Sequence, residues 1–158
     1  MDPGQWLSGF REQHEKMRAG RLSEGETRRY LSMREELARS LASSQGLTVP
    51  EGQNARKFFR VAQVYTVEIN NLYKGLTKDI SRSGFSTIVP TSMKEGDPLA
   101  FSFVLKRGED PVTGRGKVIT ALKQQGNTRI SCSIDTISDA NAERLEMALF
   151  DAVLSRIK

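Results

Sequence analysis

Leu99-Ala100-Phe101-Ser102-Phe103-Val104-Leu105 is the stretch that decides the fold, because a bulky apolar side chain stands at every second position. Residues two apart in a β-strand point to the same face of the sheet. A period of two therefore predicts a strand with one buried face. The same period occurs in two other segments: Val61, Tyr65, Val67 and Ile69, and Ile130, Cys132 and Ile134.

Turn-forming residues separate these alternating segments. They stand at Asn70-Asn71, at Lys94–Asp97, at Arg107–Pro111 and at Gln125–Asn127. About six short strands in roughly 75 residues are typical of a small antiparallel barrel or sandwich. We therefore expect a mainly β protein with flanking helices.

The helices are expected at the two ends of the chain. Apolar residues recur at helical spacing in the segments 5–20 and 23–45, and Ser23-Glu24-Gly25-Glu26 has the form of a capping box. The chain then predicts an N-terminal antiparallel helical hairpin over 1–45, a linker over 46–55 with Gly, Pro and Asn, and a barrel with a C-terminal helix over 56–158. Neither helical stripe can be buried by two helices alone, so the hairpin is also a candidate surface for a downstream protein.

The net charge, the cysteine count and the distribution of apolar residues limit the classes of protein that this chain can belong to. The 158 residues carry a net charge of +5 and contain one cysteine, Cys132, so an internal disulfide is excluded. No signal peptide or membrane-spanning stretch is recognised, and a cytoplasmic location is the expectation. Most of the excess positive charge falls in residues 56–84, which favours an anionic partner such as a nucleotide, a nucleic acid or a membrane surface.

Two short motifs lie at the ends of this basic segment. Arg56-Lys57-Phe58-Phe59-Arg60 reads R-x-x-x-R, and Asp79-Ile80-Ser81-Arg82-Ser83-Gly84 reads D-x-S-x-x-G. A strand that leaves Arg60, turns near residues 70–75 and returns antiparallel would place the second motif beside the first. We expect Asp79 and Ser81 to share one face of the returning strand.

The residue types in the two motifs suit a ligand that is both anionic and guanine-bearing. An arginine fork holds phosphate through two parallel hydrogen bonds and also matches the O6/N7 edge of guanine. Asp79 can accept from the N–H groups of guanine, whereas a bare phosphate would be repelled by it. Gly84 permits a positive φ or a close approach of the backbone.

The motif pair resembles that of PilZ domains, bacterial receptors for cyclic di-GMP, over about residues 54–150. The resemblance implies a six-stranded antiparallel β-barrel with a C-terminal helix, and cyclic di-GMP as the ligand. It further implies an arginine-bearing linker that closes over the ligand and changes the interaction with a downstream partner. The implied ligand-binding residues are Arg56, Arg60, Asp79, Ser81 and Gly84, with Lys57 and Arg82 as additional contributors to the local field.

Other classes of function are weighed against this one. A PilZ-like adaptor that binds proteins without the ligand is one alternative. A nucleic-acid-binding barrel is less favoured. Such barrels favour exposed aromatic side chains on which bases stack, and only Phe58, Phe59 and Phe85 are plausible platforms here. No acid/base pair, metal cluster or activated nucleophile can be placed, so we expect no catalytic residue, no metal and no cofactor. The regulated process, ligand stoichiometry and oligomeric state do not follow from the sequence.

Overall fold

The computed structural model describes residues 2–157 and divides into two compact units, one ending at Phe59 and the other beginning at Arg60. The first unit contains α1 (Pro3–Arg18), α2 (Glu24–Ser44) and the 3₁₀ turn η1 (Ala55–Lys57). Both expected helices are present. The side chain of Ser23 accepts from the backbone N–H of Glu26, and the side chain of Glu26 accepts in return from the N–H of Ser23, which completes the capping box.

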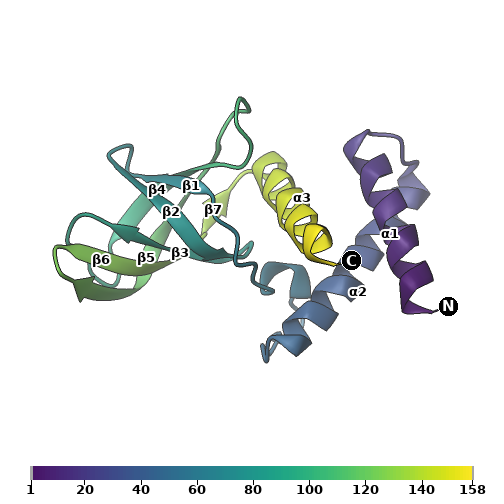
Figure 1. Cartoon of the computed structure of the whole chain (residues 1–158), viewed down its shortest axis with the longest axis horizontal. Coiled ribbons are helices and arrows are strands. Elements are labelled where there is room, and N and C mark those ends of the chain that lie inside the picture. Colours follow the sequence, from purple (N-terminus) through teal and green to yellow (C-terminus); the bar gives the residue numbers. More distant parts are fainter. Residues whose placement is uncertain (1, 158) are drawn as a thin grey trace. The chain divides into compact units, whose positions relative to one another are not determined.

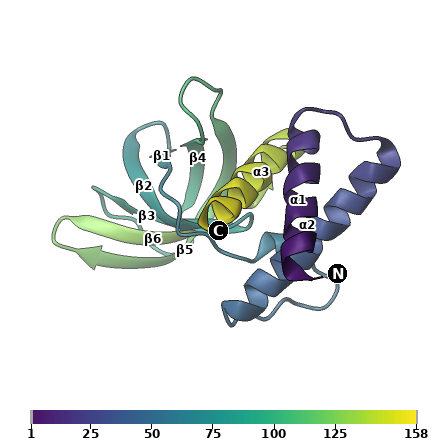
Figure 2. The ribbon, with the colours of Figure 1, turned by 45° about the vertical axis from the view of Figure 1, so that its right-hand side comes forward.

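α1 and α2 form the expected antiparallel hairpin, and aromatic side chains join them (Figure 2). The rings of Phe10 and Tyr30 stack with their centroids 5.6 Å apart. Nδ1 of His14 lies 2.5 Å from the hydroxyl of Tyr30, and Nε of Arg34 donates to this hydroxyl at 2.8 Å. Tyr30 and His14 are buried, so these residues of the helical stripes are packing residues.

The second unit is a closed antiparallel barrel, which decides between the expected barrel and sandwich (Figure 1). Its strands lie in the order β4-β1-β2-β3-β6-β5, and β4 also pairs with β5 to close the ring. A seventh strand, β7, adds to the other edge of β5. The strands are β1 (Thr66–Ile69), β2 (Tyr73–Ile80), β3 (Gly84–Val89), β4 (Pro98–Val104), β5 (Val112–Gln124), β6 (Asn127–Ser133) and β7 (Thr136–Ile137).

One expected boundary is wrong. The first strand was expected to leave Arg60, but β1 begins only at Thr66. Val61 pairs with Ile80 through an isolated bridge, with backbone hydrogen bonds of 2.9 Å in both directions. This bridge still brings the segment after Arg60 beside the end of β2, so the predicted antiparallel return holds at the motifs.

The barrel interior is filled by an aromatic cluster from the stretch that decides the fold. Phe101 and Phe103 on β4 meet Phe85 on β3, with ring centroids between 4.9 and 5.7 Å apart. Edge-to-face arrangements of this kind add to the free energy gained from burying apolar area. Phe85 and Phe103 are fully buried.

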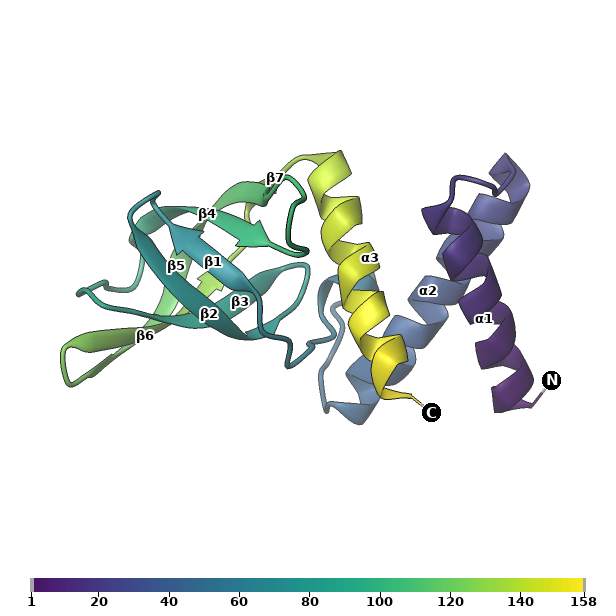
Figure 3. The same cartoon turned by 45° about the horizontal axis from the view of Figure 1, so that its top comes forward.

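The C-terminal helix α3 (Asp139–Arg156) begins after the capping residue Ser138, whose side chain accepts from the backbone N–H of Asn141. It contacts the barrel along β5, and Figure 3 shows it following β7. Leu145, Leu149 and Phe150 are buried residues of this helix. Within residues 2–157, no helix combines the length and the apolar character that crossing a bilayer requires.

Cys132 provides a test of the barrel. Its side chain faces inward from β6, is 3% exposed, and burial raises the pKa of its thiol to about 12. Because the thiolate is the reactive species, we expect Cys132 in the native protein to react with an alkylating reagent at pH 8 far more slowly than a free thiol. Denaturant should restore the reaction. Rapid labelling of the native protein, followed by mass spectrometry, would contradict this burial.

Candidate functional site

Arg60 and Asp79 form the centre of the candidate site. Nη2 of Arg60 lies 2.9 Å from Oδ1 of Asp79, and Nε lies 3.3 Å from Oδ2, so the guanidinium fork and the carboxylate meet side by side. The bridge between Val61 and Ile80 places Arg60 at the end of β2, where Asp79 stands. Both side chains are 40% exposed, so the ion pair faces solvent.

The surroundings of Asp79 keep it charged. The hydrogen bond from Arg60 lowers the pKa of Asp79 below its ordinary value, and partial burial opposes this shift. The hydroxyl of Ser86 donates to Oδ1 at 2.9 Å and lowers the pKa further, as does the positive charge of Arg129. Asp79 is therefore a carboxylate at neutral pH, able to accept hydrogen bonds and unable to donate them.

A hollow of about 430 Å³ lies on the outer face of the barrel beside this ion pair. It spans β3 and β6, whose register places Ser86 opposite Ser131 and Ile88 opposite Arg129. The lining is mostly polar and contains two arginines. Its residues are Arg60, Asp79, Ser83, Gly84, Phe85, Ser86, Ile119, Arg129, Ser131, Cys132 and Ser133.

Ser81 organises the loop between β2 and β3. It is fully buried, and its hydroxyl lies 3.3 Å from the carbonyl of Gly84 and 3.1 Å from the hydroxyl of Ser83, and accepts from the N–H of Ser83 at 3.2 Å. Hydrogen bonds of this kind fix a tight turn. Ser81 therefore shapes the loop that borders the hollow, and direct contact with a ligand stays a prediction for it.

Gly84 lines the hollow and serves the barrel as well. A Cβ atom at this position would lie 2.5 Å from the carbonyl oxygen of Cys132 on β6. At position 84 the backbone of β3 therefore lies closer to β6 than a residue with a Cβ atom would allow. The close approach that the sequence suggested is present between two strands of the barrel.

Arg56 and Lys57 lie in η1, in the first compact unit. Glu35 on α2 holds this turn, because its carboxylate accepts from the backbone N–H groups of Ala55 at 2.9 Å and Arg56 at 3.3 Å. Nε of Arg56 lies 3.6 Å from the same carboxylate. Arg56 is thus bound to an internal carboxylate, and its role toward a ligand stays a prediction.

Arg82, expected as an additional contributor, is directed toward the C-terminal helix. Its Nη1 lies 2.8 Å from a carboxylate oxygen of Glu146 on α3, whose side chain is 3% exposed. This ion pair ties the loop between β2 and β3 to α3. The pairing crosses 64 residues of sequence, so no local pattern pointed to Glu146.

Sequence reasoning missed several residues of the hollow. Ser86 could have been found, because it follows Gly84 by two positions in a strand and so shares its face. Arg129 and Ser131 face outward on either side of the buried Ile130, which is the same kind of signal. Ile119 could not have been found, because it falls at an irregularity in the pairing of β5 with β6.

The side chains of the hollow suit the binding of a ligand with both anionic and hydrogen-bonding groups. Two cationic forks, one carboxylate and several hydroxyl groups can hold phosphate oxygens and the polar edge of a base. Within residues 2–157, no group of His, Cys, Asp and Glu side chains is arranged to hold a metal ion. The fold and site define a small antiparallel barrel domain whose outer face has a polar hollow bordered by two arginines.

Comparison with known families identifies the class. The PilZ domain model matches residues 54–151, and the chain belongs to the PilZ domain family. Comparison of the sequence with curated proteins gives no match.

Solved structures with the same fold include two PilZ-type relatives. The PilZ domain of YcgR from Escherichia coli, solved with c-di-GMP, aligns with a TM-score of 0.51 and 15% identity, covering 63% of this chain and 92% of that one. The Bacillus subtilis inhibitor of motility MotI/DgrA aligns with a TM-score of 0.55 and 16% identity over 62% of this chain. The chain spans only 50% of the length of that second protein. At such identities these likenesses establish the fold.

Proposed function

We propose that this protein is a non-catalytic receptor for cyclic di-GMP. The observation that carries the proposal is the Arg60–Asp79 ion pair, with Ser86, at the mouth of a polar hollow on a PilZ barrel. Membership of the family and the ligand in the YcgR structure support the choice of cyclic di-GMP. We expect the protein to act in the cytoplasm of a bacterium, and the proposal requires no metal and no cofactor.

The proposed ligand suits the charges of the site. Cyclic di-GMP has two phosphate groups and two guanine bases, so it presents anionic oxygens together with N–H donors. In the ligand-free state the fork of Arg60 is held ready by Asp79. On binding, Arg60 turns its donors to a phosphate or to the O6/N7 edge of guanine, and Asp79 accepts from the Watson–Crick edge. Ser81 and Gly84 keep the loop in place.

Arg56 joins the ligand when the linker closes, and to do so it exchanges one anion for another. In the structure, the carboxylate of Glu35 holds both the backbone N–H and the side chain of Arg56. Glu35 therefore stabilises the open state, and binding shifts the population only if the ligand phosphate outcompetes it. The closure would release η1 from α2, which is how binding could change the surface of the hairpin.

This exchange makes Glu35 a test of the switch. Glu35→Gln removes the negative charge and keeps the shape, so we expect cyclic di-GMP to bind about threefold to tenfold more tightly, the size of one ionic contact. The neighbour Glu36 is exposed on the same helix, and Glu36→Gln is the matched control. Equal or weaker binding by Glu35→Gln, measured by calorimetry, would contradict the exchange.

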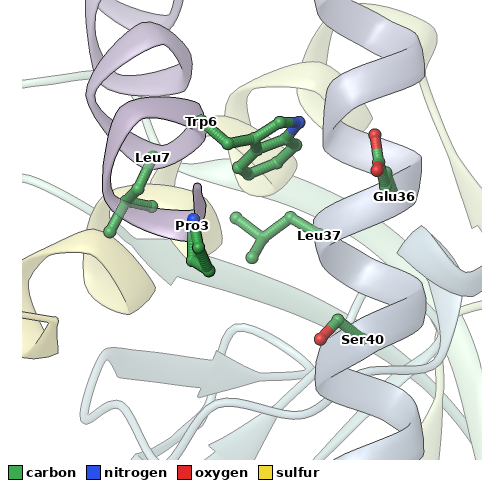
Figure 4. Close-up of a pocket in the computed structure, with 6 residues that line it drawn as sticks. All are labelled: Pro3, Trp6, Leu7, Glu36, Leu37 and Ser40. Carbon is green, nitrogen blue, oxygen red and sulfur yellow. The ribbon is translucent and has the colours of Figure 1, made fainter. Parts of the chain in front are cut away.

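A downstream protein is expected to bind the hairpin. An open groove of about 310 Å³ lies between α1 and α2. Figure 4 shows Trp6 and Pro3 of α1 facing Leu37 of α2 there. Leu7, Glu36 and Ser40 complete the lining. An apolar groove with a polar rim is the kind of surface that takes a partner side chain. This groove supports the hairpin as the place of contact, and the partner itself is not identified by it.

The two rival functions make different demands on the exposed side chains of the barrel. A nucleic-acid-binding barrel needs exposed aromatic platforms, but Phe59 and Phe85 are fully buried, which leaves Phe58 half-buried as the remaining candidate. A PilZ-like adaptor without a ligand would have no use for an arginine fork held open to solvent, yet it stays the main alternative.

Calorimetric titration with cyclic di-GMP, GMP and GTP tests the proposal. A receptor should bind cyclic di-GMP at micromolar concentrations or tighter and bind the two mononucleotides much more weakly. Absence of heat and of competition by cyclic di-GMP at tens of micromolar would favour the adaptor. Equal binding of all three nucleotides, with a steep dependence on salt, would favour a general anion-binding surface.

A further inference from the structure

Arg129 differs from the motif arginines in the state of its guanidinium group. Arg60 is paired with Asp79, Arg56 with Glu35 and Arg82 with Glu146. The side chain of Arg129 lies on the outer face of β6 and is exposed, and its guanidinium group makes no hydrogen bond or ion pair with any residue between 2 and 157. Its donors can therefore meet an incoming anion without displacing a carboxylate.

Its position places it in the same hollow as the motif residues. Arg129 and Ser131 are two apart on β6, so they share the outward face. Ser131 stands opposite Ser86, the residue that donates to Asp79. The positive charge of Arg129 is also close enough to Asp79 to help lower the pKa of that carboxyl. Arg129 and Arg60 thus border one hollow from β6 and from the segment before β1.

Two neighbours complete the β6 side of the hollow. The hydroxyl of Ser131 has no hydrogen-bond partner within the described part of the chain, so it is free to donate to a ligand oxygen. Ile119, in the irregularity of β5, is 48% exposed although it is apolar. A cationic fork, a free hydroxyl and an apolar surface side by side fit a phosphate next to the face of a flat base.

We infer that Arg129 and Ser131 form a phosphate-binding subsite outside the two sequence motifs, with Ile119 as the apolar wall for the adjacent base. The inference rests on the proposed function, because it names further contacts of the same ligand. The subsite holds the part of a cyclic dinucleotide that lies away from Arg60, so it discriminates in favour of a ligand with two phosphates. A mononucleotide such as GMP carries a single phosphate, so it cannot supply a separate phosphate to each arginine.

The test compares four variants by calorimetric titration with cyclic di-GMP and with GMP. Arg129→Ala should weaken cyclic di-GMP binding by about tenfold to a hundredfold, the size of one charge-assisted hydrogen-bonded contact. Arg129→Lys keeps the charge but loses the fork, and it should recover only part of the loss. Ser131→Ala should weaken binding by a few-fold. Arg107→Ala removes the same charge from an exposed loop outside the hollow, and it should bind like wild type.

The outcomes separate the two proposals. If Arg129→Ala binds cyclic di-GMP with an affinity within about twofold of wild type, the subsite is overturned and the receptor function stays intact. A loss as large in Arg107→Ala as in Arg129→Ala would reduce the effect to net charge and would also overturn it. No binding by the wild-type protein would overturn both. Arg129 is an exposed side chain, so the melting temperature of Arg129→Ala should match wild type and a folding defect is not expected.

Discussion

Replacing Arg60 with alanine should lower the affinity for cyclic di-GMP by at least about a hundredfold, which is the largest effect on binding that the site predicts. The fork of Arg60 lies at 2.9 and 3.3 Å from the two oxygens of Asp79, so it is already oriented toward the hollow. Removing it takes away two charge-assisted hydrogen bonds to the ligand. It also leaves the charge of Asp79 uncompensated beside the ligand phosphate.

The controls for Arg60→Ala separate binding from folding. The ion pair is 40% exposed on both sides, so its loss should change the free energy of unfolding by less than about 1 kcal/mol. Lys78→Ala, on the same strand as Asp79 and exposed, removes one positive charge outside the hollow and should retain binding. Binding by Arg60→Ala within a few-fold of wild type would contradict the site.

Replacing Gly84 with alanine should have the largest effect on stability among the motif residues. The new methyl group would lie 2.5 Å from the carbonyl oxygen of Cys132, and backbone cannot move aside as a flexible side chain can. Forcing extra volume into a packed site of this kind costs about 1–3 kcal/mol, and separation of β3 from β6 would also disturb the hydrogen bonds between them. Denaturant unfolding followed by circular dichroism measures the change.

Gly9→Ala is the matched control for the glycine substitution. A Cβ atom at Gly9 meets nothing within 4 Å, and this residue lies inside α1. Alanine is favoured over glycine there by roughly 0.5–1 kcal/mol, so this change should be neutral or stabilising. A Gly84→Ala protein as stable as wild type would show that the strands have room, and the role assigned to this glycine would then be wrong.

The strands and helices could be predicted because their signals are local, whereas the closed barrel was expected from the resemblance of the motif pair to PilZ domains. The alternation from Leu99 to Leu105 gave a strand whose Phe101 and Phe103 lie in the barrel core. The capping residues Ser23 and Ser138 stand where the helices begin, because a cap depends only on its nearest neighbours. The beginning of β1 was placed too early, since the pattern at Val61 is satisfied by a single bridge.

The candidate site could be predicted only where a motif named its residues. Arg60 and Asp79 meet as the antiparallel return required. Ser86, Arg129 and Ser131 depend on the register between strands far apart in the sequence, which alternation alone does not fix.

The partners of the motif arginines lay equally outside the local sequence. Glu35 and Glu146 pair with Arg56 and Arg82 across the tertiary structure. In the proposed receptor, Glu35 must release Arg56 before that arginine can reach the ligand.

We propose that cyclic di-GMP binds at the Arg60–Asp79 hollow of the barrel. An NMR titration of the ¹⁵N-labelled protein tests it most directly, because the side-chain Nε–H of Arg60 and the backbone amides of residues 79–86 and 129–131 report on that place. We expect saturable shifts concentrated in those signals, with the Nε–H of Arg60 among the largest. Saturable shifts confined to α1 and α2, or no shifts at millimolar ligand, would contradict it.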